Sequence, residues 1–159
     1  MAEHSTLTGA SLHEPKGVAA ASASTVYIAD GAGSGTWTNP YASVNNANKI
    51  YLFGQIDDIS TAGSVFIPCP LAGDVNKIWV TLQGAITVAD AIVTAEIAGV
   101  AITGLSVTVA YTGSAGGSTF SDTPTGGNTL TAGQALEIIT DGGSTTAMAA
   151  IVCVEVDVS

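Results

Sequence analysis

The sequence predicts an all-β protein: an antiparallel β-sandwich of jelly-roll-like type, preceded by an extended N-terminal arm that contains a short hairpin. Three observations support this prediction. Short apolar runs recur about every 8–12 residues and are separated by glycine-rich turns. Two of these runs alternate apolar and polar residues with a period of two. Large apolar residues are sparse before residue 48, so we assign residues 1–48 to the arm and residues 49–159 to the sandwich.

Within the arm, the sequence predicts a hairpin that joins residues 25–29 to residues 36–38, because Asp30-Gly31 is a turn dipeptide. An isolated hairpin is marginally stable in water, so this one should be docked on something. In the sandwich, strands are expected at residues 50–53, 64–67, 75–83, 91–97, 100–103, 105–111, 129–130, 135–140 and 146–158. The alanines of residues 86–97 are compatible with a helix, but the β-branched residues there favour a strand.

The two alternating runs indicate which side of each strand is buried. In residues 75–83, one face carries three aliphatic core candidates, which are Ile78, Val80 and Leu82. In residues 146–158, the buried face is expected to be the one formed by Val152, Val154, Val156 and Val158. Trp79 lies on the outer face of its strand, where it could stack on a sugar ring or lie in a subunit interface. The alternative is that both faces of its strand are covered.

Charge and histidine content exclude several classes of function. The chain has 13 acids, three lysines and no arginine, for a net charge of −10, so nucleic-acid binding and clamping of a phosphorylated substrate are not expected. The two histidines, His4 and His13, lie in the arm, so we expect no histidine-based catalysis. Glycines interrupt the long uncharged stretch at residues 97–121, so no membrane span is expected. The N-terminus lacks the pattern of a signal peptide, which predicts folding in a bacterial-type cytoplasm.

The remaining candidates for chemistry have simpler interpretations. Asp57-Asp58, with Asp122 and Asp141, could ligate calcium, but the loop pattern of a calcium site is absent and solvated turn acids are the simpler interpretation. The glycine-rich residues 31–35 lack the lysine of a phosphate-binding loop. Cys69 and Cys153 are expected to be small buried side chains. We therefore expect no catalytic residue, no cofactor and no metal.

Two segments of the arm resemble a known class of protein. Residues 7–18, LTGASLHEPKGV, and residues 25–37, TVYIADGAGSGTW, are similar to the N-terminal signature of tailed-bacteriophage head fibres and capsid decoration proteins. The resemblance implies a non-enzymatic structural protein, trimeric and located on the virion's capsid surface after synthesis in the host bacterial cytoplasm. Its implied partners are the major capsid protein and further copies of itself. From the charge and the lack of a membrane span, no nucleic acid and no membrane are expected as partners.

The arm is the candidate contact with the capsid or a neighbouring subunit, because its apolar side chains can be buried on a partner while its backbone extends a sheet edge. Nothing near Trp37 in the sequence covers its ring, so we expect it to be buried on a partner. The candidate contact residues are Leu12, His13, Glu14, Pro15, Lys16, Val18, Tyr27, Trp37 and Tyr41. For residues 13–16 the alternative is a solvated flexible tag.

Two other functions remain as alternatives. A receptor- or glycan-binding fibre head would display aromatic and carboxamide side chains on exposed loops, and the sparse loop aromatics give little support for a glycan ligand. A glycan depolymerase would need two carboxylates on either side of the scissile bond, and no such pair can be identified.

Overall fold

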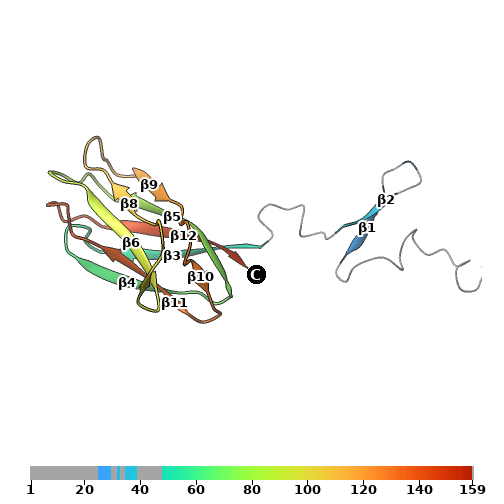
Figure 1. The fold of residues 1–159 in the computed structure, drawn as a ribbon. Coiled ribbons are helices and arrows are strands. Elements are labelled where there is room, and N and C mark those ends of the chain that lie inside the picture. Colours follow the sequence, from blue (N-terminus) through green and yellow to red (C-terminus); the bar gives the residue numbers. More distant parts are fainter. Residues whose placement is uncertain (1–24, 30–31, 33–34, 39–47, 159) are drawn as a thin grey trace, which may run out of the picture. The chain divides into compact units, whose positions relative to one another are not determined.

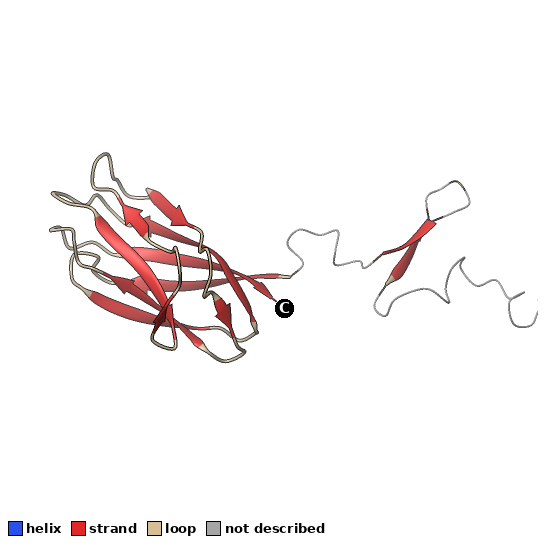
Figure 2. Ribbon diagram, viewed as in Figure 1, coloured by secondary structure: helices blue, strands red, loops and turns tan. Residues whose placement is uncertain are grey.

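The chain divides into two compact units, residues 1–47 and residues 48–159. The structure, a computed structural model, describes residues 25–29, 32, 35–38 and 48–158. All regular elements in these residues are β-strands (Figures 1 and 2), which confirms the predicted all-β class. None of the described residues belongs to a helix long and apolar enough to cross a membrane.

The described part of the first unit is the expected hairpin. Strand β1 (Val26–Ala29) pairs antiparallel with β2 (Gly35–Thr38). The register places Tyr27 directly opposite Trp37. Side chains directly opposite each other in an antiparallel pair lie on the same face, so these two aromatic residues share one side of the hairpin.

The second unit is a sandwich of two antiparallel sheets (Figure 1). The β3 sheet has the order β10-β5-β12-β3, with β9 also paired to β5. Its strands are β3 (Lys49–Ile56), β5 (Gly73–Leu82), β9 (Thr119–Asp122), β10 (Thr129–Leu130) and β12 (Ala150–Val158). The β4 sheet has the order β4-β11-β6-β7, with β8 also paired to β6. Its strands are β4 (Gly63–Pro68), β6 (Ala91–Ile97), β7 (Val100–Ala101), β8 (Val107–Val109) and β11 (Ala135–Thr140).

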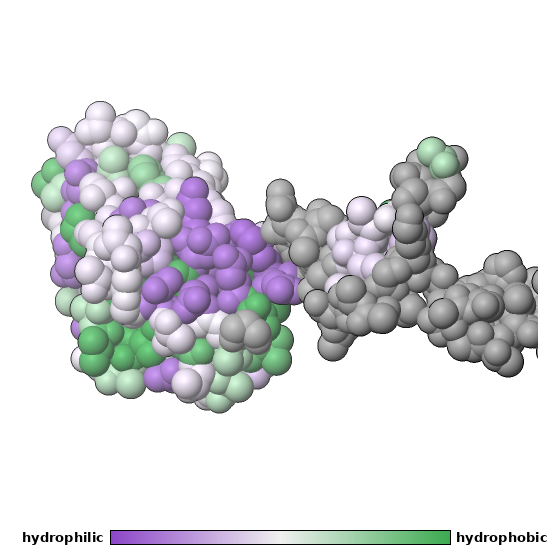
Figure 3. All heavy atoms as spheres, turned by 45° about the vertical axis from the view of Figure 1, so that its right-hand side comes forward, coloured by the Kyte–Doolittle hydropathy of each residue, from purple (hydrophilic) through white to green (hydrophobic). Residues whose placement is uncertain are grey.

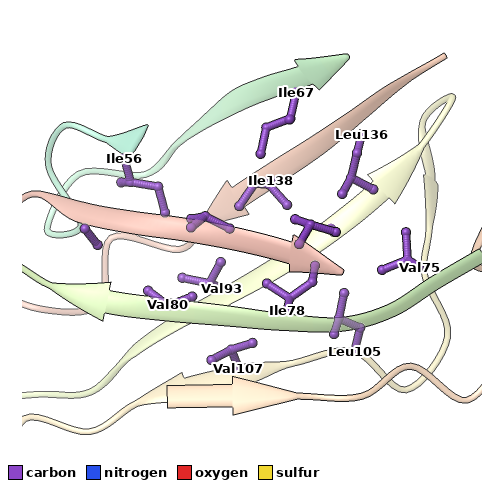
Figure 4. Packing of buried hydrophobic residues seen from close by; sticks show 14 of the residues in the cluster. Ile56, Ile67, Val75, Ile78, Val80, Val93, Leu105, Val107, Leu136 and Ile138 are labelled. Atoms are coloured by element: carbon purple, nitrogen blue, oxygen red, sulfur yellow. The ribbon is translucent and has the colours of Figure 1, made fainter. Parts of the chain in front are cut away.

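The core fills the space between the two sheets, where aliphatic side chains from both interdigitate (Figure 4). The predicted core face of β5 is confirmed, because Ile78, Val80 and Leu82 are at most 1% exposed. The predicted valine face of β12 is confirmed for the three residues Val152, Val154 and Val156. Val158 is only half-buried, because it lies at the last position of the strand, where its cross-strand neighbour on β5 is Gly73.

Gly54 brings the two sheets together at one edge of the sandwich. It lies on β3 opposite the buried Val152 of β12, so it faces the core. A Cβ atom at this position would lie 2.7 Å from Cδ1 of Ile67 on β4. The missing side chain therefore makes room for Ile67, which joins the edge strands of the two sheets in one core.

The strands predicted at residues 100–103 and 105–111 are both shorter in the structure, where β7 covers only residues 100–101. Strand β8 covers only residues 107–109, because carboxylates take the backbone donors on both sides of it. The N–H of Ser106 donates to Oδ2 of Asp122 at 2.8 Å, and the N–H of Tyr111 donates to Oδ1 of Asp90 at 2.9 Å. These side chains replace the neighbouring strand that would otherwise accept those hydrogen bonds.

Two further differences from the predicted strands concern β9 and β12. The strand expected at residues 146–158 begins only at residue 150. The residues before it form hydrogen bonds with other loops, and the carbonyl of Met148, for example, accepts a hydrogen bond from the N–H of Ile59 at 2.8 Å. Strand β9 was not expected, because Phe120 is the only large apolar residue in it. Pairing with β5 makes it a strand.

The buried position of Ile78 gives a direct test of the core. Ile78→Ala should lower the free energy of unfolding by about 2–5 kcal/mol, because it removes buried methyl groups and leaves a cavity. Val100→Ala is the control, since Val100 is 66% exposed and should change stability by less than about 0.5 kcal/mol. Urea unfolding followed by tryptophan fluorescence measures both. Equal effects would contradict the assignment of Ile78 to the core.

Candidate partner-binding surfaces

The arm residues singled out in the sequence divide into two groups. Tyr27 and Trp37 lie in the β1–β2 hairpin. The other candidates lie outside the described residues, and these are Leu12, His13, Glu14, Pro15, Lys16, Val18 and Tyr41. Their role as contact residues therefore remains a prediction.

Tyr27 and Trp37 pack against each other within the hairpin. Their ring centroids are 5.4 Å apart with an interplanar angle of 60°, an edge-to-face arrangement. Both side chains are half-buried. The expectation that nothing near Trp37 in the sequence covers its ring was therefore wrong, because the hairpin turn brings Tyr27 beside it.

The opposite side of the hairpin carries two exposed apolar residues beside Thr36 and Thr38. Val26 and Ile28 alternate with Tyr27 along β1, and their side chains are 45% and 50% exposed. A two-stranded hairpin with apolar residues on both faces suits an element that binds to another surface.

A second candidate surface is the outer side of the β3 sheet. We call it the aromatic face, and it consists of Tyr51, Phe53, Trp79, Ile151 and Cys153. The register places Phe53 opposite Cys153, and Cys153 opposite Trp79, so three adjacent strands form one continuous row. Phe53 is 67% exposed and Tyr51 is 46% exposed. The outward direction predicted for Trp79 agrees with this arrangement.

Lys77 limits what can bind to Trp79. Its ammonium nitrogen lies 5.3 Å from the centroid of the indole ring, a cation–π contact within one strand. The Trp79 side chain is half-buried. A ligand stacked on the same side of the indole, whether a sugar ring or a protein side chain, would have to displace Lys77.

Beside the aromatic face, Glu155 forms the centre of a polar network. Its Oε1 accepts hydrogen bonds from Nζ of Lys49 and Nδ2 of Asn76, and its Oε2 accepts one from the Tyr51 hydroxyl at 3.1 Å. Nζ of Lys49 also lies 3.6 Å from Oδ1 of Asp157. Hydrophilic residues gather over this end of the sandwich, beside an apolar area (Figure 3).

The network shifts the pKa values of Glu155 and Lys49. Hydrogen bonding from Lys49 holds the pKa of Glu155 below its ordinary value of 4.5, although burial opposes this effect. The same contact raises the pKa of Lys49 above 10.5. Glu155, only 7% exposed, is therefore an ionised carboxylate that three side chains satisfy. The sequence predicted its outward direction but gave no sign of its burial.

The paired acids Asp57 and Asp58 lie at a hollow of about 310 Å³ between the end of β3 and the start of β4. Asp58 is used by its own turn, because its carboxylate accepts hydrogen bonds from the N–H and hydroxyl of Ser60 and from the hydroxyl of Thr61. These contacts, led by the Ser60 hydroxyl, lower its pKa. Asp57 accepts a hydrogen bond from the Gln55 amide at 2.9 Å. The carboxylates of these two acids are therefore engaged in local hydrogen bonds of the loop.

Asp122 and Asp141 also accept hydrogen bonds from backbone groups. Asp122 accepts from the N–H of Ser106, as described above, and Oδ1 of Asp141 accepts from the N–H groups of Ile92 and Gly143, both at 2.9 Å. Within the described residues, no three His, Cys, Asp or Glu side chains gather in a way that could hold a metal ion. Of the acids considered for calcium, Asp57 and Asp58 share one loop, whereas Asp122 ends β9 and Asp141 follows β11.

The two cysteines differ in their environment. Cys69 is fully buried, and its Sγ donates to the carbonyl of Leu71 at 3.1 Å, which confirms the expected small buried side chain. Cys153 is half-buried in the middle of the aromatic face, so the same expectation was wrong for it. Burial raises the pKa of the Cys153 thiol, which keeps it protonated.

The Glu155 network predicts a dependence of stability on pH. Since the pKa of Glu155 is lowered by folding, its stabilisation is complete above pH 4.5 and is lost as the pH falls through the lowered folded-state value. Glu155→Gln should lower the melting temperature at pH 7 and make the decrease below pH 4.5 shallower. Glu137→Gln, which removes a charge from the β4 sheet, is the control. If the melting temperatures of wild type and Glu155→Gln fall by the same amount between pH 7 and pH 3, this role is contradicted.

No family model matches the sequence, and no curated protein matches it. A solved structure with a similar fold is a chain from the cyanophage Pam1 capsid asymmetric unit. It is 21% identical, the match covers 70% of this chain and 86% of that chain, and the TM-score is 0.46. The likeness concerns the fold alone.

Proposed function

We propose that this protein is a structural virion protein that decorates and stabilises the exterior of a tailed-phage capsid as a homotrimer. The observation that carries the proposal is the resemblance of residues 7–18 and 25–37 to the N-terminal signature of head fibres and capsid decoration proteins. In this proposal the arm binds the major capsid protein, and the sandwich is displayed outward.

The strand order of the sandwich supports the proposal. The first strand of the body, β3, pairs with its last strand, β12, and the two sheets read β3-β12-β5-β9 and β4-β11-β6-β8. We interpret this order as a jelly roll, an architecture found among viral capsid domains and also among lectins. Since fold alone does not assign function, the arm and not the sandwich distinguishes the two.

The hairpin supports a role of the arm in attachment. It presents Val26 and Ile28 on one side and the Tyr27–Trp37 pair on the other. Burial of such side chains on a partner is worth about 25 cal/mol for each Å² of apolar surface removed from water. Many copies arranged on one particle would strengthen a modest affinity of each arm.

Removal of the arm tests where the capsid contact lies. A chain without residues 1–47 should stay folded, because the described core lies within residues 48–158, and should no longer bind expanded capsids. Asn48 is kept because its carbonyl accepts a hydrogen bond from the N–H of Val158. Cosedimentation with particles measures binding, and circular dichroism measures folding. Full occupancy by the truncated protein would place the contact on the sandwich.

Trp37→Ala tests the hairpin itself. If the Tyr27–Trp37 side contacts the capsid, the variant should bind about 2–4 kcal/mol more weakly, the range of interface hot spots. The melting temperature of the sandwich should stay unchanged, since Trp37 is in the other unit. Phe66→Ala is the control, as it removes an exposed aromatic ring from the body. Wild-type capsid binding by Trp37→Ala would remove Trp37 from the contact.

A further inference from the structure

The two sheets of the sandwich present outer faces of different chemistry. On the aromatic face, the row that begins at Phe53 continues through Cys153 and Trp79. On the β4 sheet, the equivalent row begins at Phe66 of β4 and continues through Glu137 and Glu96, which lie directly opposite each other. Both rows start from an exposed phenylalanine on an edge strand, but one is apolar and the other is acidic.

The distribution of lysines follows the same division. Both lysines that the structure describes, Lys49 and Lys77, lie on the outer side of the β3 sheet. Lys49 neutralises the buried Glu155, and Lys77 covers Trp79. The acids with outward positions on this side are Asp74, Glu155 and Asp157, so the face is close to neutral although the chain carries a net charge of −10.

This charge pattern determines which contact between two copies is favourable. Identical chains with a net charge of −10 repel each other, and the repulsion is strongest where carboxylates such as Glu96 and Glu137 would meet. The repulsion is weakest where lysines balance the acids and where aromatic side chains exclude water on contact. The aromatic face meets both conditions, so it fits a second copy of this chain better than the outer side of the β4 sheet does.

We propose that the aromatic face is the surface through which copies of this chain associate, with Phe53 as its main anchor. This inference deepens the proposed function, because it rests on the proposed homo-oligomer and names the face that forms it. Phe53 is the most exposed large apolar side chain of the face, and its row crosses three adjacent strands whose other sides face the core. Cys153 lies inside the contact, where association should cover its thiol.

Phe53→Ser tests the proposal in the full chain, with Phe66→Ser as the matched control. The two side chains are 67% and 62% exposed, so neither substitution should unfold the protein, and the melting temperature verifies this. Sedimentation velocity over a range of protein concentrations measures association. Wild type and Phe66→Ser should form the same oligomer, whereas Phe53→Ser should need at least tenfold higher concentration to do so.

Cys153 provides a second measurement that does not depend on a variant. Its alkylation by a maleimide should slow as the wild-type protein concentration rises through the association range. Cys69, which is fully buried in the core, should react slowly at every concentration. A rate for Cys153 that does not change while the oligomer forms would overturn the proposal.

The possible outcomes separate this inference from the proposed function. If the oligomer persists in Phe53→Ser, the role of the aromatic face is overturned, whether or not Phe66→Ser dissociates. The proposed homo-oligomer itself would not be contradicted by that result. A wild-type chain that stays monomeric at all concentrations overturns both the face and the homotrimer. Capsid binding is measured independently by cosedimentation. A chain that binds capsids but does not self-associate would support the decoration role and contradict the homotrimer.

Discussion

Burial of the valine side of β12 is the constraint on which the sandwich depends. Strand β12 lies between β3 and β5, so it is paired along both edges. Because side chains alternate along a strand, placing Val152, Val154 and Val156 in the core forces Cys153 and Glu155 to the outside. A shift of one residue would bury the carboxylate among aliphatic side chains. The position of the aromatic face follows from this single choice of side.

Carboxylates shape the loops of the sandwich. The side chains of Asp58, Asp90, Asp122 and Asp141 each accept hydrogen bonds from backbone N–H groups outside the regular strands. Such contacts satisfy donors that no neighbouring strand reaches. Several acids of this chain, which has few lysines, therefore serve local structure.

The candidate surfaces could be predicted only in part. The outward direction of Trp79 and the hairpin that carries Trp37 followed from alternation and from a turn dipeptide, both of which are local signals. The packing of Tyr27 on Trp37 required the register of the hairpin. The aromatic face could not be predicted, because Phe53, Trp79 and Cys153 become neighbours only through pairing between strands far apart in the sequence.

By itself, the sequence determined the all-β class, the hairpin and the core faces of β5 and β12. Only the tertiary structure decided what lies beside each outward side chain. A bulge at Asn76 shows the reason, because it turns both Asn76 and Val75 away from the sides that strict alternation assigns them, so that Val75 is buried and Asn76 reaches Glu155. Alternation is a property of one strand, whereas bulges, registers and buried ion pairs depend on its partners.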